Sequence, residues 1–275
     1  MKNRYGVAIL ASDGIYEWLL PFLESYRRHN PDLPTYLIPF DARMERTTRA
    51  AAAYGVQMAP GDLGPVDRLG FIAYPHYRRR YRNRLRKFHS LSLPLDEVLY
   101  IDIDTIVYRD LSVLFGRLKP GETDFIVAST RPDWVYTKRM HRYPFLADAV
   151  LFSDGCFVTS SRILSLERMT ATLKANRLTF WNVRKQHVYA QPVANFVAHR
   201  LGLKIAVAED LIPGIRCEAV YNAPDARFEP DGPVSADGRP IHFAHWAGAI
   251  ETPTDDAFAA SWHACASRAA ERLRR

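Results

Sequence analysis

The sequence of 275 residues contains only three cysteines, and they lie far apart at Cys156, Cys217 and Cys265. No C-x-x-C pair is present, and no pair of histidines has the spacing of zinc ligands. We therefore expect reduced, packed thiols and neither a disulfide framework nor a zinc site. No apolar run approaches the length of about eighteen residues that a transmembrane helix requires. The first residues also lack the apolar segment of a signal peptide, so these absences predict a cytoplasmic protein.

Two common phosphate-binding motifs are absent as well. The sequence has neither G-x-G-x-x-G nor G-x-x-x-x-G-K-S/T, which argues against a dinucleotide-binding fingerprint and against a P-loop. Internal repeats and low-complexity tracts are also missing. Because 48% of the residues are hydrophobic and 24% are charged, the composition is typical of a globular chain with one large core. We therefore expect a single domain.

The net charge is +7, and much of the excess lies in residues 78–87, which read Arg-Arg-Arg-Tyr-Arg-Asn-Arg-Leu-Arg-Lys. Such a segment favours contact with phosphate groups of nucleic acid, an acidic membrane or a substrate, and a solvated helix face is the alternative. Its place just upstream of the strand described next suggests that some of its cations reach a bound diphosphate. A second basic cluster at 268–275 ends a helix predicted over 257–275. There, cations favour the helix dipole, with at most weak contact with an acidic membrane.

Two carboxylates interrupt an otherwise apolar run at residues 98–107. The run reads Val-Leu-Tyr-Ile-Asp-Ile-Asp-Thr-Ile-Val, which is typical of a strand buried on both faces. Because side chains alternate along a strand, Asp102 and Asp104 are predicted to point to one side, with Ile103 in the apolar layer. The carboxylates are expected at the carboxyl end of this strand, where ligands bind in sheets covered on both faces. Two oxygen ligands on one face suit Mg²⁺ or Mn²⁺. A turn and its cap are the simpler interpretation, but acidic residues rarely interrupt a buried run without a partner.

Strands and helices alternate along the chain. Further strands are predicted at 6–11, 35–40, 56–58, 124–129 and 151–158, and helices at 15–29, 47–54, 161–176 and 192–201. This βαβ rhythm predicts an α/β domain of the nucleotide-binding type. The aromatic segment at 132–145 is expected to form a loop or lid, and residues 224–240 a surface loop.

Residues 84–110 resemble the D-x-D region of GT-A fold glycosyltransferases, most closely family 8, which contains glycogenin and the lipopolysaccharide galactosyltransferases. Three more segments resemble segments of this family and occur in the same order along the chain. Leu-Ala-Ser-Asp-Gly-Ile-Tyr at 10–16 resembles the family's nucleotide-binding turn, Phe-Ser-Asp-Gly at 152–155 its Phe-Asn-x-Gly strand, and His-Trp-Ala-Gly at 245–248 its His-Phe-x-Gly segment. The resemblance implies a Rossmann-like α/β fold in which helices flank a mixed, mostly parallel sheet. Residues 1–118 would form the nucleotide-sugar half, 119–250 the sugar-pocket and acceptor half, and 251–275 a C-terminal helix.

The resemblance also implies roles for individual residues. The implied metal ligands are Asp102, Asp104 and His245. The implied donor-binding residues are Ala11, Ser12, Tyr16, Arg84, Lys87, Asp102 and Ile103. The sugar pocket would contain Asp154, Gly155 and Gln191, with Asp154 and Gln191 as catalytic residues. His242 is an alternative third metal ligand if a bulge displaces its strand.

The implied activity is transfer of a sugar from a nucleotide diphosphate sugar, with a UDP-sugar favoured, to a carbohydrate, lipid-linked or protein acceptor. Mn²⁺ or Mg²⁺ would neutralise charge on the departing diphosphate, and basic side chains would assist. The family retains the anomeric configuration; if this chain inverts it, Asp154 or Asp133 is the candidate base. Ser153 stands where the family has Asn, and Ala190 where it has Asp, so the donor sugar stays open.

Three other functions compete with sugar transfer. A sugar nucleotidyltransferase usually carries a glycine-rich, basic loop after its first strand, but residues 12–16 contain no basic residue. A nucleic-acid-binding module would use the arginine segment with Tyr74, Tyr77 and Tyr81 as a stacking platform. It would leave the aspartate pair and His245 unexplained, so no nucleic-acid partner is expected. A non-catalytic relative of the transferases is the third alternative.

Overall fold

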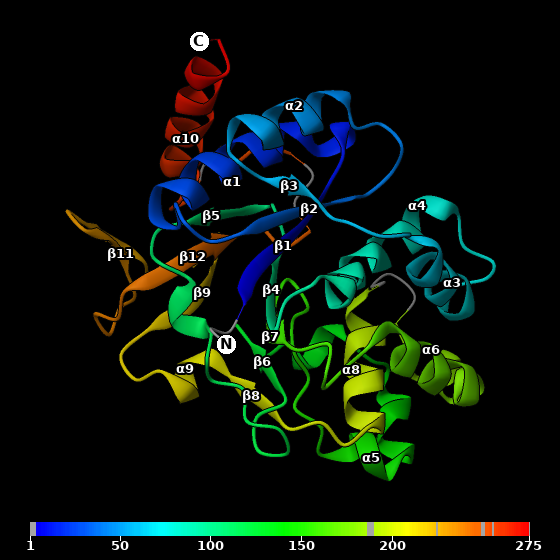
Figure 1. The fold of residues 1–275 in the computed structure, drawn as a ribbon. Coiled ribbons are helices and arrows are strands. Elements are labelled where there is room, and N and C mark those ends of the chain that lie inside the picture. Colours follow the sequence, from blue (N-terminus) through cyan, green and yellow to red (C-terminus); the bar gives the residue numbers. More distant parts are fainter. Residues whose placement is uncertain (1–3, 186–189, 224, 249–250, 255, 275) are drawn as a thin grey trace.

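Strand β1 (Tyr5–Ala11) lies inside the main sheet, and all but its first residue are buried. The computed structural model describes residues 4–185, 190–223, 225–248, 251–254 and 256–274. Within this part of the chain the main sheet has the order β3-β2-β1-β4-β7-β6-β8 (Figure 1). Its other strands are β2 (Thr35–Pro39), β3 (Gln57–Met58), β4 (Glu97–Ile101), β6 (Phe125–Val127), β7 (Cys156–Thr159) and β8 (Ile205–Val207). Neighbouring strands are parallel except where β7 pairs with β4 and β6. The prediction of a mixed, mostly parallel sheet is confirmed.

Helices cover both faces of this sheet because its strands are apolar on both sides. Val7 and Ile9 of β1 belong to one hydrophobic cluster, with α1 (Tyr16–His29) and α10 (Ala259–Arg272). The alternate residues Ala8 and Leu10 belong to a second cluster on the opposite face. That face is covered by α3 (Gly64–Ala73), α6 (Leu166–Ala175), α7 (Arg177–Val183) and α8 (Ala190–Arg200). In Figure 1, α1 and α10 lie at the upper left and α3, α6 and α8 at the right.

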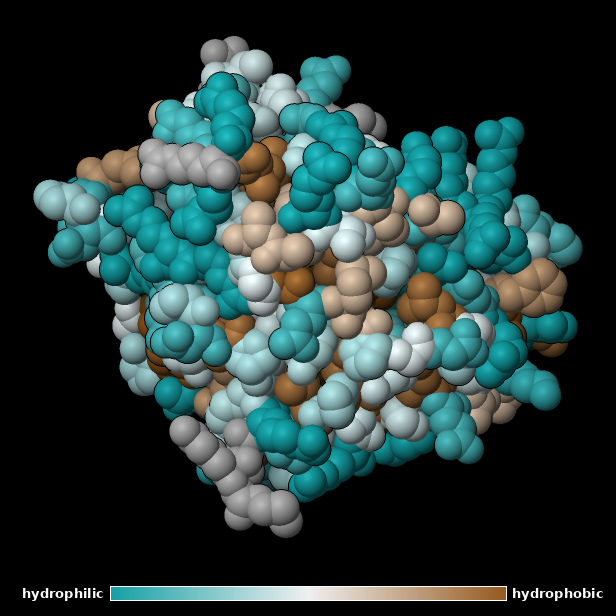
Figure 2. Space-filling model, turned by 45° about the horizontal axis from the view of Figure 1, so that its top comes forward, coloured by the Kyte–Doolittle hydropathy of each residue, from teal (hydrophilic) through white to brown (hydrophobic). Residues whose placement is uncertain are grey.

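The described residues also form shorter helices, namely α2 (Glu45–Ala53), α4 (Arg79–Arg82), α5 (Pro144–Ala147) and α9 (Ala208–Leu211). They form 3₁₀ turns at Asp13–Ile15, Asn83–Ser92, Ser112–Leu114, Pro132–Trp134 and Lys138–Arg142. Figure 2 shows hydrophilic side chains over much of the visible face, with hydrophobic ones among them at its centre and right. None of the helices in the described ranges is both long and apolar enough to cross a membrane.

A second sheet lies beside the first and has the order β5-β12-β9. It is formed by β5 (Thr105–Val107), β9 (Arg216–Val220) and β12 (Ile241–His245), with β12 antiparallel to β5 and parallel to β9. The backbone N–H of Val107 in β5 donates to Ser25 Oγ of α1 at 3.1 Å, which attaches this sheet to the first layer of helices. A hairpin of β10 (Arg227–Glu229) and β11 (Gly232–Val234) precedes β12.

Strand β4 ends at Ile101, so the two aspartates follow its carboxyl end as predicted, but residues 105–107 form β5 in the other sheet and do not continue this strand. The three residues between them turn the chain from one sheet to the next. The N–H of Asp102 donates to the Gly155 carbonyl at 2.7 Å, whereas the Asp104 carbonyl accepts from Trp246 N–H at 2.8 Å. Strand alternation is therefore not what brings the two carboxylates together; the turn does this.

Other expected elements have different bounds. The basic segment 78–87 contains one α-helical turn, Arg79–Arg82, and then continues in 3₁₀ turns, since neighbouring like charges disfavour a longer helix. Helix α3 was missed, because Pro65 indicates a turn in sequence but lies in the first turn of this helix, where proline is tolerated. Strand β7 begins only at Cys156, and the predicted loop 224–240 contains the β10–β11 hairpin. Residue 275 of the predicted C-terminal helix lies outside the described residues.

Candidate metal and donor site

Several chain segments meet at one edge of the main sheet. Strands β1 and β4 are parallel, so Ser12 and Asp102 follow their carboxyl ends at the same edge. Strand β7 runs the other way, and its first residue Cys156 pairs with Ile101. Asp154 and Gly155, which precede β7, therefore lie at this edge too. The last residue of β12, His245, pairs with Thr105, directly after the Asp102–Asp104 turn.

Asp102, Asp104 and His245 form a cluster with the composition of a divalent metal site. Each offers one ligand atom, and these atoms all lie within 4.8 Å of one another. Nε2 of His245 is 3.3 Å from Oδ1 of Asp104. Two carboxylates and one imidazole suit Mn²⁺, and the carboxylates alone suit Mg²⁺. These three residues therefore fit the metal ion that the sequence predicts.

Lys87 supplies a buried positive charge beside this cluster. The residue is only 5% exposed, and its Nζ lies 3.2 Å from Asp102 Oδ2 and 3.1 Å from Asp154 Oδ2. Burial would lower the pKa of Lys87, but Asp102 and Asp154 hold it above its ordinary value. Burial raises the pKa of Asp102, and Lys87 opposes that shift. Lys87 is therefore the cation that holds the carboxylates of Asp102 and Asp154 near each other.

The far side of the His245 ring contacts Glu218, which sequence reasoning missed. Nδ1 of His245 is 2.6 Å from Oε1 of Glu218. Burial would raise the pKa of Glu218, but the contacts with His245, Arg131 and Ser129 lower it to about 2. Burial would likewise lower the pKa of His245, but Asp104 and Glu218 raise it well above its ordinary value. A metal ion at Nε2 would thus replace a proton.

Of the two histidines considered as the third ligand, His245 is the one beside Asp104. His242 lies three residues earlier on β12, and an odd separation places the two side chains on opposite faces of a strand. The carbonyl of His242 accepts from Tyr108 N–H at 2.8 Å, while its Nδ1 is buried without a hydrogen-bond partner in the described structure. Burial lowers the pKa of His242.

The residues predicted near the nucleotide lie at the end of β1. Ala11 and Ser12 are buried, and Tyr16 begins α1. The guanidinium of Arg46 lies over the Tyr16 ring, 3.9 Å from its centroid. Asp13 has a structural role here, because its Oδ1 accepts from the backbone N–H of Thr47 at 2.8 Å in the first turn of α2.

The remaining predicted residues differ in how they relate to the cluster. Ile103 is buried between the two aspartates, as expected. Arg84 is exposed, although it belongs to the same 3₁₀ segment as Lys87. Asp133, the alternative base, is also exposed. Gln191 is buried at the start of α8, and no hydrogen bond or ion pair joins it to the cluster among the residues that the structure describes.

Asn195 is a second residue that sequence reasoning missed. Its side chain is fully buried and makes two hydrogen bonds to the backbone of Phe152, at 3.0 Å and 2.9 Å. A third bond joins its Nδ2 to the carbonyl of Gln191 at 3.0 Å. Asn195 therefore fixes the start of α8 against the segment that leads to Asp154.

No protein-family model matches the sequence, and no curated protein matches it either. Solved structures do. The chain resembles the WbbM bifunctional glycosyltransferase (TM-score 0.63, 12% identity, 100% of this chain and 52% of that one). It also resembles the glycosyltransferase GlyE of Streptococcus pneumoniae, with a TM-score of 0.60 and 15% identity over 99% of this chain and 62% of that one. A third similar structure is an active-site mutant of LgtC, with a TM-score of 0.62 and 15% identity over 96% of this chain and 95% of that one.

The chain thus spans about half of the WbbM chain, three fifths of the GlyE chain and nearly all of the LgtC chain. At these identities the likeness establishes the fold, which is the GT-A fold that the sequence predicts.

Proposed function

We propose that this chain is a metal-dependent glycosyltransferase that moves a sugar from a nucleotide diphosphate sugar to an acceptor. The observation that carries the proposal is the cluster of Asp102, Asp104 and His245, whose ligand atoms lie within 4.8 Å at one edge of the sheet. The glycosyltransferase neighbours share the fold around it, and one LgtC structure contains donor and acceptor sugar analogs. The sequence resemblance favours a UDP-sugar as donor.

A divalent metal held by these three residues would neutralise charge on the departing nucleoside diphosphate. The protein's contribution is to hold the three ligand side chains close together at the place where the metal would bind. Lys87 balances the charge of Asp102 and Asp154 in a buried setting, so we assign it to the support of the carboxylates. Arg84, exposed on the same segment, is the proposed contact of the diphosphate.

Retention of the anomeric configuration is the proposed stereochemical outcome, because it needs no general base. Asp154, the nearest alternative base, is 7% exposed and its Oδ2 faces Lys87 Nζ at 3.1 Å. That ion pair opposes transfer of an acceptor proton to Asp154, since the carboxylate would have to give up its cation. Asp154 and Gln191 are proposed to line the sugar pocket, with Ala11, Ser12 and Tyr16 near the nucleotide.

The experiment is a screen of UDP-, GDP- and CDP-sugars for release of nucleoside diphosphate with Mn²⁺ present. We expect slow hydrolysis of one donor class by the wild type and none by the Asp102→Asn/Asp104→Asn double variant. Asp237→Asn, on the surface segment beside β11, is the matched control and should keep the activity. Release of pyrophosphate from a nucleoside triphosphate and a sugar phosphate would instead identify a nucleotidyltransferase.

A further inference from the structure

Glu218 is a buried acid that lies one strand away from the candidate metal ligand His245. It occupies the middle of β9, which pairs in parallel with β12, and it is 4% exposed. Its Oε1 lies 2.6 Å from Nδ1 of His245, so an N–H at Nδ1 donates directly to the carboxylate. The other ring nitrogen, Nε2, faces Asp104 at 3.3 Å. The two ring nitrogens of His245 therefore have different carboxylate partners on opposite sides.

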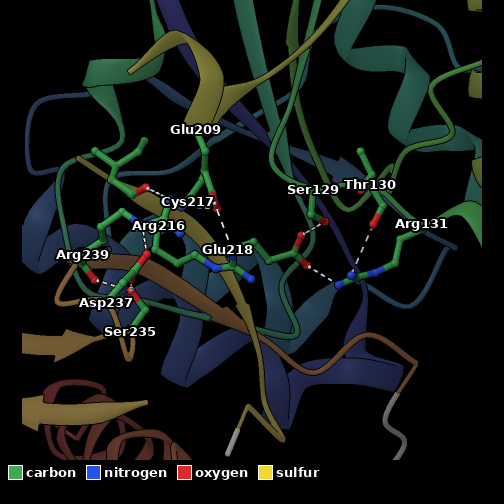
Figure 3. Close-up of polar contacts among 11 residues, drawn as sticks. Ser129, Thr130, Arg131, Glu209, Arg216, Cys217, Glu218, Ser235, Asp237 and Arg239 are labelled. Carbon is green, nitrogen blue, oxygen red and sulfur yellow. Dashed lines mark hydrogen bonds and ion pairs between the residues drawn. The ribbon is translucent and has the colours of Figure 1, made fainter. Parts of the chain in front are cut away.

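Two further groups hold the Glu218 carboxylate in place (Figure 3). The hydroxyl of Ser129 donates to Oε2, and the guanidinium of Arg131 lies 3.5 Å from Oε1. Both come from the segment that follows β6 and leads into the aromatic residues at 132–145. Because both carboxylate oxygens have partners, rotation of Glu218 away from His245 would break several charged contacts at once.

Gly155 lies beside another edge of the His245 ring, at Cε1. A Cβ atom at this position would lie 2.5 Å from Cε1 of His245 and 3.3 Å from Asp102 Oδ2. The ring is thus held by Glu218 at Nδ1, and the space beside Cε1 has no room for a side chain at position 155. A ring turned to present Nδ1 to the metal would lose the bond to Glu218.

We propose that Glu218 is a positioning residue that accepts the Nδ1–H of His245 and thereby presents the Nε2 lone pair to the metal. This inference rests on the metal site of the proposed function. A hydrogen bond from the second ring nitrogen fixes the orientation of a histidine ligand and makes it a better donor to the metal. Ser129 and Arg131 extend this support to the segment that begins the predicted acceptor side.

A purely structural ion pair is the competing explanation, because a buried pair contributes to packing whether or not a metal binds. The two explanations predict different effects on metal binding when Glu218 is replaced by a neutral side chain of the same size. Glu218→Gln keeps the size of the side chain and an acceptor oxygen, but it removes the negative charge that strengthens the bond from Nδ1–H and makes Nε2 a better donor to the metal. If Glu218 only supports packing, the variant loses stability but binds metal as the wild type does.

The test is calorimetric titration of Mn²⁺ into the full chain. We expect Glu218→Gln to bind Mn²⁺ about 10- to 100-fold more weakly than the wild type. Glu209→Gln is the matched control, also shown in Figure 3. Glu209 contacts Arg239, Arg216 and the Cys217 N–H instead of His245, so its variant should keep wild-type affinity.

A spectroscopic readout separates positioning from packing. Pulsed electron paramagnetic resonance of bound Mn²⁺ should show coupling to one histidine nitrogen in the wild type and a weakened coupling in Glu218→Gln. If Glu218→Gln does not fold, the Ser129→Ala/Arg131→Met double variant should show the same changes, because it frees the Glu218 carboxylate. Wild-type affinity and nitrogen coupling in the folded variant would overturn the proposal for Glu218 alone. Absence of Mn²⁺ binding by the wild type would overturn the metal site itself.

Discussion

Gly155 and His245 are ninety residues apart in sequence, yet a Cβ atom on Gly155 would lie 2.5 Å from Cε1 of His245. Carbon atoms that are not bonded through a common neighbour do not approach that closely, and the obstacle is a ring already held by Glu218 at 2.6 Å. The residue just before β7 therefore lies so close to the last side chain of β12 that no Cβ atom fits between them. The absence of a side chain at position 155 is a condition for the candidate metal site.

We predict that Gly155→Ala weakens Mn²⁺ binding by about tenfold or more, because His245 must move away from Asp104. Calorimetric titration measures this directly. Gly55→Ala is the control: its φ of +64° disfavours alanine, but nothing lies within 4 Å of the added methyl group. Gly55→Ala should lower the free energy of unfolding by about 1 kcal/mol and leave the Mn²⁺ affinity unchanged. Equal affinities for both variants would contradict this account of Gly155.

Lys87→Met should destabilise the metal-free protein, because it leaves Asp102 and Asp154 without their cation. Loss of one partner of a buried ion pair costs about 3 to 5 kcal/mol, and we expect the lower end because the Asp102 side chain is 28% exposed. Added Mn²⁺ should raise the melting temperature of Lys87→Met more than that of the wild type. Lys174→Met, at an exposed position, is the control. A metal-free melting temperature equal to that of the wild type would show that Lys87 does not stabilise the carboxylates.

The buried His242 should make stability fall on acidification. Burial lowers its folded-state pKa, whereas the unfolded chain takes up a proton near pH 6.5. Below about that pH the unfolded state binds more protons at His242 than the folded state does, so the free energy of unfolding decreases as pH falls. Urea denaturation at pH 7.5 and 5.5 should therefore show a smaller loss for His242→Gln than for the wild type. An identical loss would mean that His242 titrates alike in both states.

Asp13 should matter for stability and not for nucleotide contact. Burial would raise its pKa, but hydrogen bonds from the α2 backbone, chiefly that of Thr47, lower it. The stability that Asp13 contributes is thus present above the unfolded pKa and is lost as pH falls through the lower folded value. Asp13→Ala should lower the melting temperature at pH 7 with unchanged nucleotide affinity, whereas Asp32→Ala, at an exposed position, should change neither. A selective loss of nucleotide binding in Asp13→Ala would indicate a ribose contact instead.

The sequence predicts the α/β fold and the aspartate pair because both leave local patterns. Apolar strands alternate with amphipathic helices, and two acids interrupt a buried run at 98–107. Strand alternation predicts that Asp102 and Asp104 share one face, but the chain turns after Ile101 into a second sheet. Whether a strand continues or turns depends on the neighbouring segments, here Gly155 and Trp246, whose positions no local pattern records.

The supporting residues could not be predicted for the same reason. Glu218 is a single acid in a five-residue strand, and its partner His245 lies 27 positions away. The contact of Lys87 with Asp154 spans 67 positions. A buried charge in a short apolar strand is the signal that could have identified Glu218, since such charges are rarely left unpaired. Its strand was not predicted, so the signal was missed.

The most direct test of the proposed metal and donor site is calorimetric titration of UDP, then GDP and CDP, with and without Mn²⁺. We predict that one nucleotide, UDP by resemblance, binds the wild type more tightly when Mn²⁺ is present. We also predict that Asp102→Ala/Asp104→Ala, while still folded, loses this dependence. Failure of the folded wild type to bind any of the three nucleotides in the presence of Mn²⁺ would contradict the proposed site.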